Sequence, residues 1–424
     1  MAKSIFVPVV TFALIASVAP NAAAQDQPPS VKTLIEQLGS KKFAERAKAS
    51  QMLEALGPKA LPELRQALKH QDPEVRARVQ KLVAVFEAIL ALAPKRVSLQ
   101  FENEPLSKVL QALHKQTGYE ITANKHENDL CRIAVKDVTF WEALEELSRS
   151  LDLTITTAPH DKGIQLVRAE ARSPFVIVNG PFRLEAKRFQ EHRDLKFDVK
   201  GANAKAGKHG NLLTLTFSVL AEPKFIFLSA GQANVDVALD EFGQKFGKPP
   251  PDPTKKPGFL EKLHIRPFEE IALLMMERSS DKAKRVKTLR GSIPVRLVVE
   301  RKPVVITERF LESTDMKFKL GADELTILEA RQDNKDKHVE FRLRIPEGLK
   351  STDWHERVVL EDAKGKRFQP DSWGTIGING SRSITLGYSA AANPKVGPPA
   401  KLIMEDWISM SHEIPFELKD VPLP

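Results

Sequence analysis

The chain contains one cysteine, Cys131, among its 424 residues. A single thiol cannot form a disulfide within the chain, so every domain has to be stable through its hydrophobic core alone. A chain of about 400 residues is larger than one core usually organises, and we expect two to four domains. Hydrophobic residues make up 42% of the chain and charged residues 28%, which indicates globular domains rather than a disordered chain.

The N-terminus has the pattern of a secretory signal. Lys3 supplies a short positive segment, residues 5–19 are almost entirely apolar, and the small residues 22–24 precede the polar Gln25. The pattern predicts a signal peptide over residues 1–24, cleaved after Ala24, and hence a periplasmic or secreted protein. A retained membrane anchor is the alternative, although the apolar stretch is shorter than the roughly 20 residues that span a bilayer.

Residues 30–92 carry apolar side chains at helical spacing in four segments, and the second pair of segments matches the first. Leu34 corresponds to Leu64, and Arg46 corresponds to Arg76. The stretch Asp72-Pro73-Glu74-Val75-Arg76 opens the fourth segment with an N-cap and a proline at the first helical position. It resembles HEAT repeats, which predicts HEAT-like α-hairpins over residues 25–95 and implies protein binding. Two repeats are fewer than a solenoid needs, so we expect them to pack on the next domain.

Between residues 96 and 168 the period of the apolar residues alternates between that of strands and that of helices. The expected order is strand, helix, strand, strand, helix, strand, strand. The segments that carry a family resemblance are 97–106, 109–113, 116–119 and 138–144. They resemble the short N-terminal (STN) domain shared by secretins and TonB-dependent receptors, and we assign residues 96–170 to such a domain.

The resemblance to the STN domain implies a periplasmic docking module without catalysis. The pore-forming part of those families has no counterpart in the rest of this sequence, so a role in secretion or in TonB coupling is not expected.

From Phe175 onward the pattern is mostly that of strands, and the two halves of this region resemble each other. Residues 239–246 match residues 360–368, and residues 293–297 match residues 414–418. We therefore predict two duplicated Ig-like β-sandwiches, over residues 171–303 and 304–424. The proline-rich segment 248–258 is either a linker or an extended loop inside the first sandwich, and the duplication favours the loop.

The sequence contains no complete catalytic or metal-binding motif. His355-Glu356 lacks the second histidine of a helical zinc site, and the glycines Gly374, Gly377 and Gly380 indicate hairpin turns rather than a phosphate loop. Ser279-Ser280-Asp281-Lys282 lacks the partner motifs of Ser-x-x-Lys enzymes. Cys131 lies in an alternating apolar run, where a small buried residue is more typical than a nucleophile.

Two weaker possibilities remain for binding. The acidic pairs Asp240-Glu241 and Glu361-Asp362 could bind Ca²⁺, but the basic residues that follow would repel the cation. The tryptophans Trp354, Trp373 and Trp407 could form a ligand platform if two of them are exposed and adjacent, although aromatic residues of a sandwich usually lie in its core. We therefore expect no catalytic residues, no cofactor and no metal.

The fold class predicted from the sequence is a multi-domain α+β protein with HEAT-like α-hairpins, a small STN-like α/β domain and two sandwiches. This combination resembles exported proteins of bacteria with elaborate envelopes, such as planctomycetes. The predicted function is that of a non-enzymatic protein-binding or scaffold protein of the cell envelope, with an envelope protein as partner. The net charge of +9 leaves open a peripheral binder of anionic polymer or lipid, whereas export argues against nucleic acid.

Overall fold

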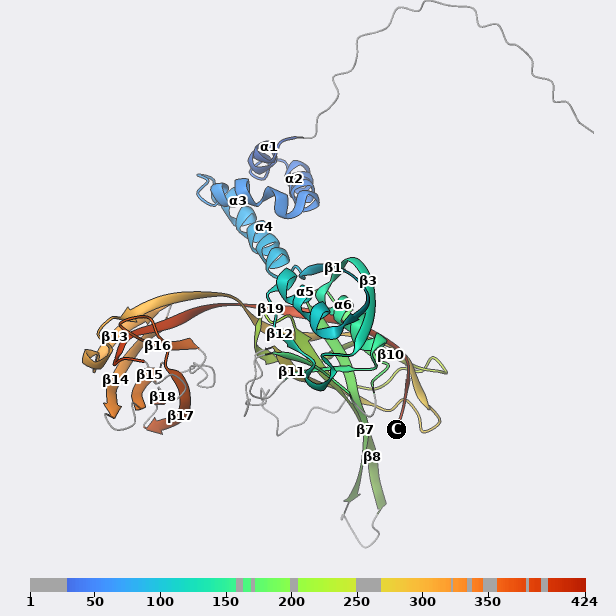
Figure 1. Ribbon diagram of the computed structural model, residues 1–424. Coiled ribbons are helices and arrows are strands. Elements are labelled where there is room, and N and C mark those ends of the chain that lie inside the picture. The colour runs from blue at the N-terminus through green and yellow to red at the C-terminus, as the bar shows by residue number, and fades with distance from the viewer. Residues whose placement is uncertain are drawn as a thin grey trace, which may run out of the picture. The chain divides into compact units, whose positions relative to one another are not determined.

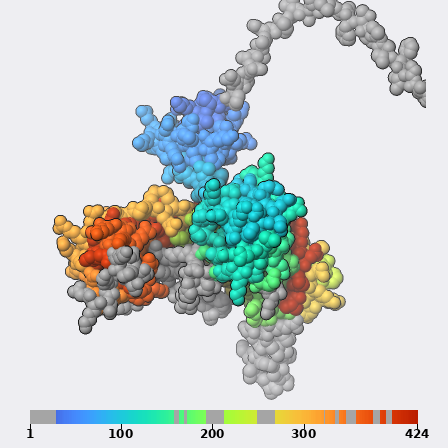
Figure 2. Space-filling view, viewed as in Figure 1, coloured from blue at the N-terminus to red at the C-terminus, as the bar shows by residue number. Residues whose placement is uncertain are grey.

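The computed structural model, shown as a ribbon in Figure 1 and as a space-filling view in Figure 2, consists of two compact units, Met1–Leu90 and Ala91–Pro424, which are described separately. The structure describes residues 29–157, 163–168, 172–198, 205–248, 268–321, 323–333, 338–345, 357–378, 381–389 and 396–424. The predicted signal peptide, His355-Glu356, Trp354, Gly380 and nearly all of the proline-rich segment lie outside these ranges. Among the described residues, no helix is long and apolar enough to span a bilayer.

The described part of the N-terminal unit is helical. Its helices are α1 (Val31–Gln37), α2 (Phe43–Leu56), α3 (Leu61–Ala67) and α4 (Pro73–Ala91), with a short 3-10 turn (Gly57–Ala60) between α2 and α3. The Ser30 hydroxyl accepts a hydrogen bond from the Thr33 amide and so caps α1. Side chains from all four helices meet in one hydrophobic cluster that includes Leu34, Leu53 and Phe86.

The predicted fold class was wrong, because the described part of the chain is mostly β, with 52% strand in several sheets and 25% helix. HEAT-like α-hairpin repeats over residues 25–95 are not shown. The first helix of each pair, α1 and α3, has only seven residues, whereas α2 has 14 and α4 has 19. With only two helix pairs and one shared core, the helices form a single small unit rather than a stack of repeats.

Residues 96–167 form an α/β region with two small sheets. Its elements are β1 (Arg96–Pro105), α5 (Leu106–Thr117), β2 (Ile121–Thr122), η2 (Asn124–His126), β3 (Leu130–Thr139), α6 (Phe140–Ser150), β4 (Thr154–Thr157) and β5 (Ile164–Val167). β1 pairs with β3, and a three-stranded sheet has the order β2-β5-β4. Helix α6 begins at a capping box formed by Thr139 and Glu142, and α5 ends at Gly118, whose φ of 80° favours glycine.

The rest of the chain is built from strands. Its elements are β6 (Val176–Asn179), β7 (Phe182–Asp198), β8 (Lys205–Ala221), β9 (Ile226–Ala230), β10 (Asn234–Asp240), β11 (Glu269–Glu277), β12 (Arg285–Thr307), η3 (Phe310–Glu312), β13 (Met316–Leu320), β14 (Asp323–Asp333), β15 (His338–Ile345), β16 (Val358–Asp362), β17 (Gln369–Ile378), β18 (Ser381–Ser389) and β19 (Pro399–Pro422). These strands form three antiparallel sheets, with orders β11-β8-β7-β6, β13-β14-β15-β18-β17 and β10-β12-β19-β16, and β9 also pairs with β12.

Two long strands, β12 and β19, run side by side through two hydrophobic cores (Figure 1). Their pairing extends from Arg285 opposite Pro422 to Thr307 opposite Leu402. One half of this ribbon packs on the sheet of β6, β7, β8 and β11, and we call that part the first β region. The other half packs on the sheet of β13, β14, β15, β17 and β18, and we call that part the second β region.

The shared ribbon corrects the prediction of two separate Ig-like sandwiches that follow each other in the chain. The C-terminal end of β19 completes the first β region, because Ile414, Phe416 and Leu418 lie in its core. The matched segments around Ile293 and Ile414 are not copies at equivalent places. They pair directly with each other, since Ile293 lies opposite Ile414.

The matched turns at Asp240 and Asp362 do have the same geometry. The Asp240 amide donates to the Gln244 carbonyl, and the Asp362 amide donates to the Lys366 carbonyl. Each turn contains a glycine at positive φ, 78° at Gly243 and 76° at Gly365. Each aspartate side chain accepts two backbone amides of its own turn. The two β regions therefore share a turn of the same construction at the end of β10 and of β16.

Candidate functional site

A buried group of charged side chains joins α6 of the α/β region to strand β7. The Arg183 guanidinium is 3% exposed and donates to Glu145 at 2.5 Å and to Glu185 at 2.7 Å. Burial alone would raise the pKa of Glu185, but the charges of Arg183 and Lys187 outweigh it and lower this pKa. The Trp141 indole donates to the Pro181 carbonyl at 2.9 Å beside this group.

A second buried carboxylate, that of Glu222, lies at the end of β8 and is fully buried. It accepts hydrogen bonds from the Lys95 amide at 2.9 Å and from the Tyr119 hydroxyl at 2.8 Å. The Lys224 ammonium lies 3.8 Å away. Burial raises the pKa of Glu222 and lowers that of Lys224. Because these contacts connect the α/β region to β8, we interpret both charged groups as internal joints rather than as reaction sites.

The acidic turns considered for Ca²⁺ have their carboxylate oxygens engaged by the protein itself. Asp240 also accepts from the Ser279 hydroxyl at 2.7 Å, and Asp362 also accepts from the Gly397 amide at 2.8 Å. Hydrogen bonds from the Gly397 and Lys366 amides lower the pKa of Asp362. Among the residues that the structure describes, no group of three or more His, Cys, Asp or Glu side chains could hold a metal ion.

The other sequence candidates do not come together in one place. Cys131 is buried, its thiol donates to the Glu104 carbonyl at 3.4 Å, and burial raises its pKa. Ser279 is held by Asp240. Trp373 on β17 is 48% exposed, but Trp407 lies on β19 in a different sheet. The two tryptophans therefore do not share a strand layer, and Trp354 lies outside the described residues.

The glycines expected in hairpin turns are placed differently. Gly374 and Gly377 lie inside strand β17, so the prediction of turns at these two positions was wrong. Ile378 at the end of β17 lies opposite Ser381 at the start of β18.

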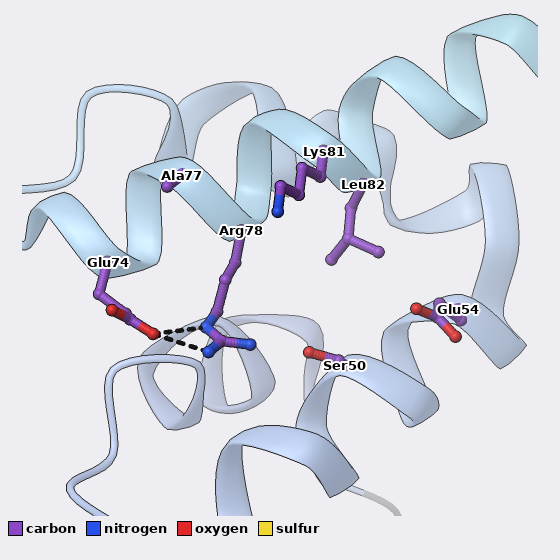
Figure 3. A pocket seen from close by; sticks show the side chains of 7 residues that line it. All are labelled: Ser50, Glu54, Glu74, Ala77, Arg78, Lys81 and Leu82. Atoms are coloured by element: carbon purple, nitrogen blue, oxygen red, sulfur yellow. Dashed lines mark hydrogen bonds and ion pairs between the residues drawn. The ribbon is translucent and has the colours of Figure 1, made fainter. Parts of the chain in front are cut away.

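The helical unit contains a groove between α2 and α4, with a volume of about 400 Å³. Figure 3 shows the side chains that line it. They are Ser50 and Glu54 from α2, and Glu74, Ala77, Arg78, Lys81 and Leu82 from α4. This volume is within the range of small-ligand and peptide pockets, but the lining is mostly polar. We call it the α2–α4 groove.

Charges of both signs line the α2–α4 groove. The Arg78 guanidinium donates twice to one oxygen of Glu74, at 2.7 and 3.0 Å, as a pair one helical turn apart. Within the described part of the chain, Glu54 and Lys81 form no ion pair. The groove therefore presents one carboxylate and one ammonium to whatever enters it.

Further along α4, the exposed apolar side chains Val85 and Ile89 continue the row that begins at Lys81. Residues four apart lie on the same face of a helix. Sequence reasoning missed the groove. The sequence shows that Ser50 and Glu54 are polar and four residues apart. It does not show that they face α4, because that depends on how the two helices pack against each other.

Comparison with protein-family models, with curated proteins and with solved structures finds no match. The chemistry of the surfaces therefore has to be inferred from the residues of this chain.

Proposed function

We propose that this chain is an exported, non-enzymatic scaffold protein of a bacterial cell envelope, and that it binds another protein through the α2–α4 groove. The observation that carries the proposal is the groove itself, which sets Glu54 and Lys81, two charges without an ion-pair partner among the described residues, beside the exposed apolar residues Val85 and Ile89. A mixed polar and apolar surface of this kind suits a protein segment better than a small apolar ligand.

The test is a pull-down with the mature chain, residues 25–424, from an envelope extract of its source. The variant Lys81→Glu reverses one charge in the groove, and Lys48→Glu makes the same change on α2 outside it. We expect the wild type and Lys48→Glu to retain a discrete protein at moderate salt. Lys81→Glu should reduce the amount of that protein retained about tenfold or more. Equal capture by both variants would exclude the groove as the binding surface.

One observation favours a second candidate, a peripheral binder of anionic polymer or lipid. Residues 29–90 contain 11 Lys or Arg and only 7 Asp or Glu. Exposed charges more than about 10 Å apart are largely screened at 0.1 M salt, so such binding would fall steeply as the salt concentration rises. In the same pull-down, capture of polymer or lipid alone, lost equally in Lys81→Glu and Lys48→Glu at low salt, would support this candidate instead.

A further inference from the structure

The outer face of the second β region carries a row of apolar side chains across three strands. Val305 on β12 lies opposite Ile403 on β19, and Ile403 lies opposite Val359 on β16. Their neighbours Met404 and Val358 point the other way, into the core. Because side chains alternate along a strand, Val305, Ile403 and Val359 lie together on the solvent side. Val305 is 49% exposed. We call these three residues the outer row.

The first β region has a different set of residues at the corresponding place. Asp240 and Asp362 end β10 and β16 in turns of the same geometry, so Val237 corresponds to Val359. Val237 lies opposite Arg290, and Arg290 lies opposite Glu417. A charged arginine and glutamate are thus compatible with this strand arrangement. The apolar outer row is therefore not required by the fold, and its exposure indicates a contact surface.

One end of the outer row is bordered by a fixed aromatic side chain. The Trp407 indole donates to Glu405 Oε2 at 2.9 Å, and the Arg357 guanidinium lies over the Trp407 ring at 5.4 Å from its centre. Arg357 also donates to the Glu405 carbonyl at 3.0 Å. Tryptophan and arginine are the residues that most often dominate binding energy at protein interfaces, and fixed side chains lose little entropy on binding.

A positive charge lies next to this tryptophan. Arg301 lies opposite Trp407 on β12, is exposed, and forms no ion pair with any residue in the described ranges. Its neighbour Lys302, in contrast, lies 3.6 Å from Glu300. A partner that binds the outer row would therefore bind more tightly if it placed a carboxylate next to Arg301.

We propose that the outer row binds an amphipathic helix of a partner protein, with aliphatic side chains on Val305, Ile403 and Val359 and a carboxylate on Arg301. Three strands span about 10 Å at their usual spacing, which matches the 10–12 Å diameter of a helix. This inference rests on the proposed protein-binding function, but it uses a surface of the second β region and not the α2–α4 groove.

The test uses two labelled peptides with the full mature chain, residues 25–424, in fluorescence anisotropy. Both are amphipathic helices of about five turns with a leucine face, and they differ only in a glutamate or a lysine beside that face. We expect the glutamate peptide to bind more tightly than the lysine peptide. Val305→Asp should lower the affinity for the glutamate peptide about tenfold or more, and Arg301→Glu should reverse the preference between the two peptides.

The matched control is Arg290→Glu, which makes the same charge change on the corresponding row of the first β region and should leave both affinities unchanged. Lys81→Glu should also leave both peptide affinities unchanged. The peptide assay therefore tests the outer row independently of the α2–α4 groove. Equal binding by wild type and Val305→Asp, or no binding of either peptide, would overturn the proposal.

Two other occupants give distinct results. Sedimentation equilibrium would reveal a second copy of this chain as a dimer that Val305→Asp dissociates. Flotation with vesicles of anionic phospholipid would reveal a membrane surface as binding that Val305→Asp abolishes. Either result, obtained without peptide discrimination, would also overturn the helix proposal.

Discussion

The first and second β regions share the ribbon of β12 and β19 and a common turn, but their outer faces and their internal charges differ. The first region is tied to the α/β region by buried charges, and the corresponding row on its outer face contains Arg290 and Glu417. In the described part of the second region, the ion pair of Arg342 and Glu329 lies at the surface, and this region carries the apolar outer row. The same strand arrangement thus tolerates both kinds of face, because only the inward side chains build the cores.

The largest expected effect comes from breaking the buried charges of the first region. Arg183→Ala removes the buried cation between Glu145 and Glu185 and leaves them with only the more exposed Arg172 and Lys187, so we expect it to lower the free energy of unfolding by about 3 kcal/mol. Arg342→Ala removes a surface pair with Glu329, where Arg342 is 42% exposed, and should cost about 0–1 kcal/mol. Urea unfolding of both variants measures the difference. Equal losses would contradict the contrast between the two regions.

The strands and helices of the α/β region could be predicted from the sequence, whereas strand β17 and the assembly of the sheets could not. Alternating patterns such as that of residues 97–101 and helical spacing such as that of residues 106–113 depend on neighbouring residues only. The turns at Asp240 and Asp362 were recognisable because aspartate and glycine have defined roles in tight turns.

The shared ribbon could not be predicted, because the similarity of residues 293–297 to residues 414–418 has two explanations. Similar apolar strands can be copies in two domains or partners in one sheet, and only long-range pairing decides between them. Each of the two candidate surfaces is also formed by residues that are far apart in the sequence. The outer row combines Val305, Val359 and Ile403 from three separate strands, and the α2–α4 groove depends on the packing of two helices.

Two glycines, Gly291 and Gly374, compare a crowded and an open backbone position. A Cβ atom on Gly291 of β12 would lie 2.0 Å from the Asn234 carbonyl oxygen, so Gly291→Ala has to separate β10 from β12. We expect a loss of about 1–3 kcal/mol. Gly374 on β17 has no atom within 4 Å of the same position, and Gly374→Ala should change stability by no more than about 0.5 kcal/mol. Thermal unfolding that ranks the two variants in the opposite order would contradict this difference between the surroundings of Gly291 and Gly374.

The pH dependence of stability should have opposite signs at the Glu222 joint and at the two turns. Burial raises the pKa of Glu222 in the folded state, so its favourable contribution is present at low pH and is lost as pH rises from about 4.3 through the raised pKa. Glu222→Gln should remove that loss and raise stability at neutral pH relative to wild type.

At the turns, the direction reverses. Hydrogen bonds from Gly397 and Lys366 lower the pKa of Asp362, and hydrogen bonds from Ser279 and the turn amides outweigh burial to lower that of Asp240. Their stabilisation is present above about pH 3.9 and is lost as pH falls through the lowered values. Asp240→Asn and Asp362→Asn should each flatten the acid side of the stability profile. Profiles that keep the wild-type shape in all three variants would contradict these assignments.

The smallest expected effect on stability comes from exchanging the outer faces, and it is the most informative one for the comparison. Arg290→Ile places an aliphatic residue in the charged row of the first region, and Val305→Arg places a charge in the outer row of the second. Both side chains are exposed, so each change should alter the free energy of unfolding by no more than about 0.5 kcal/mol. Urea unfolding checks this value, and the peptide assay checks binding in the same samples. A loss of several kcal/mol in Val305→Arg would mean that the outer row is part of the structure of the second region. Unchanged stability together with lost peptide binding would mean that the apolar side chains are there for a partner, since the corresponding row of the first region shows that the strands do not need them.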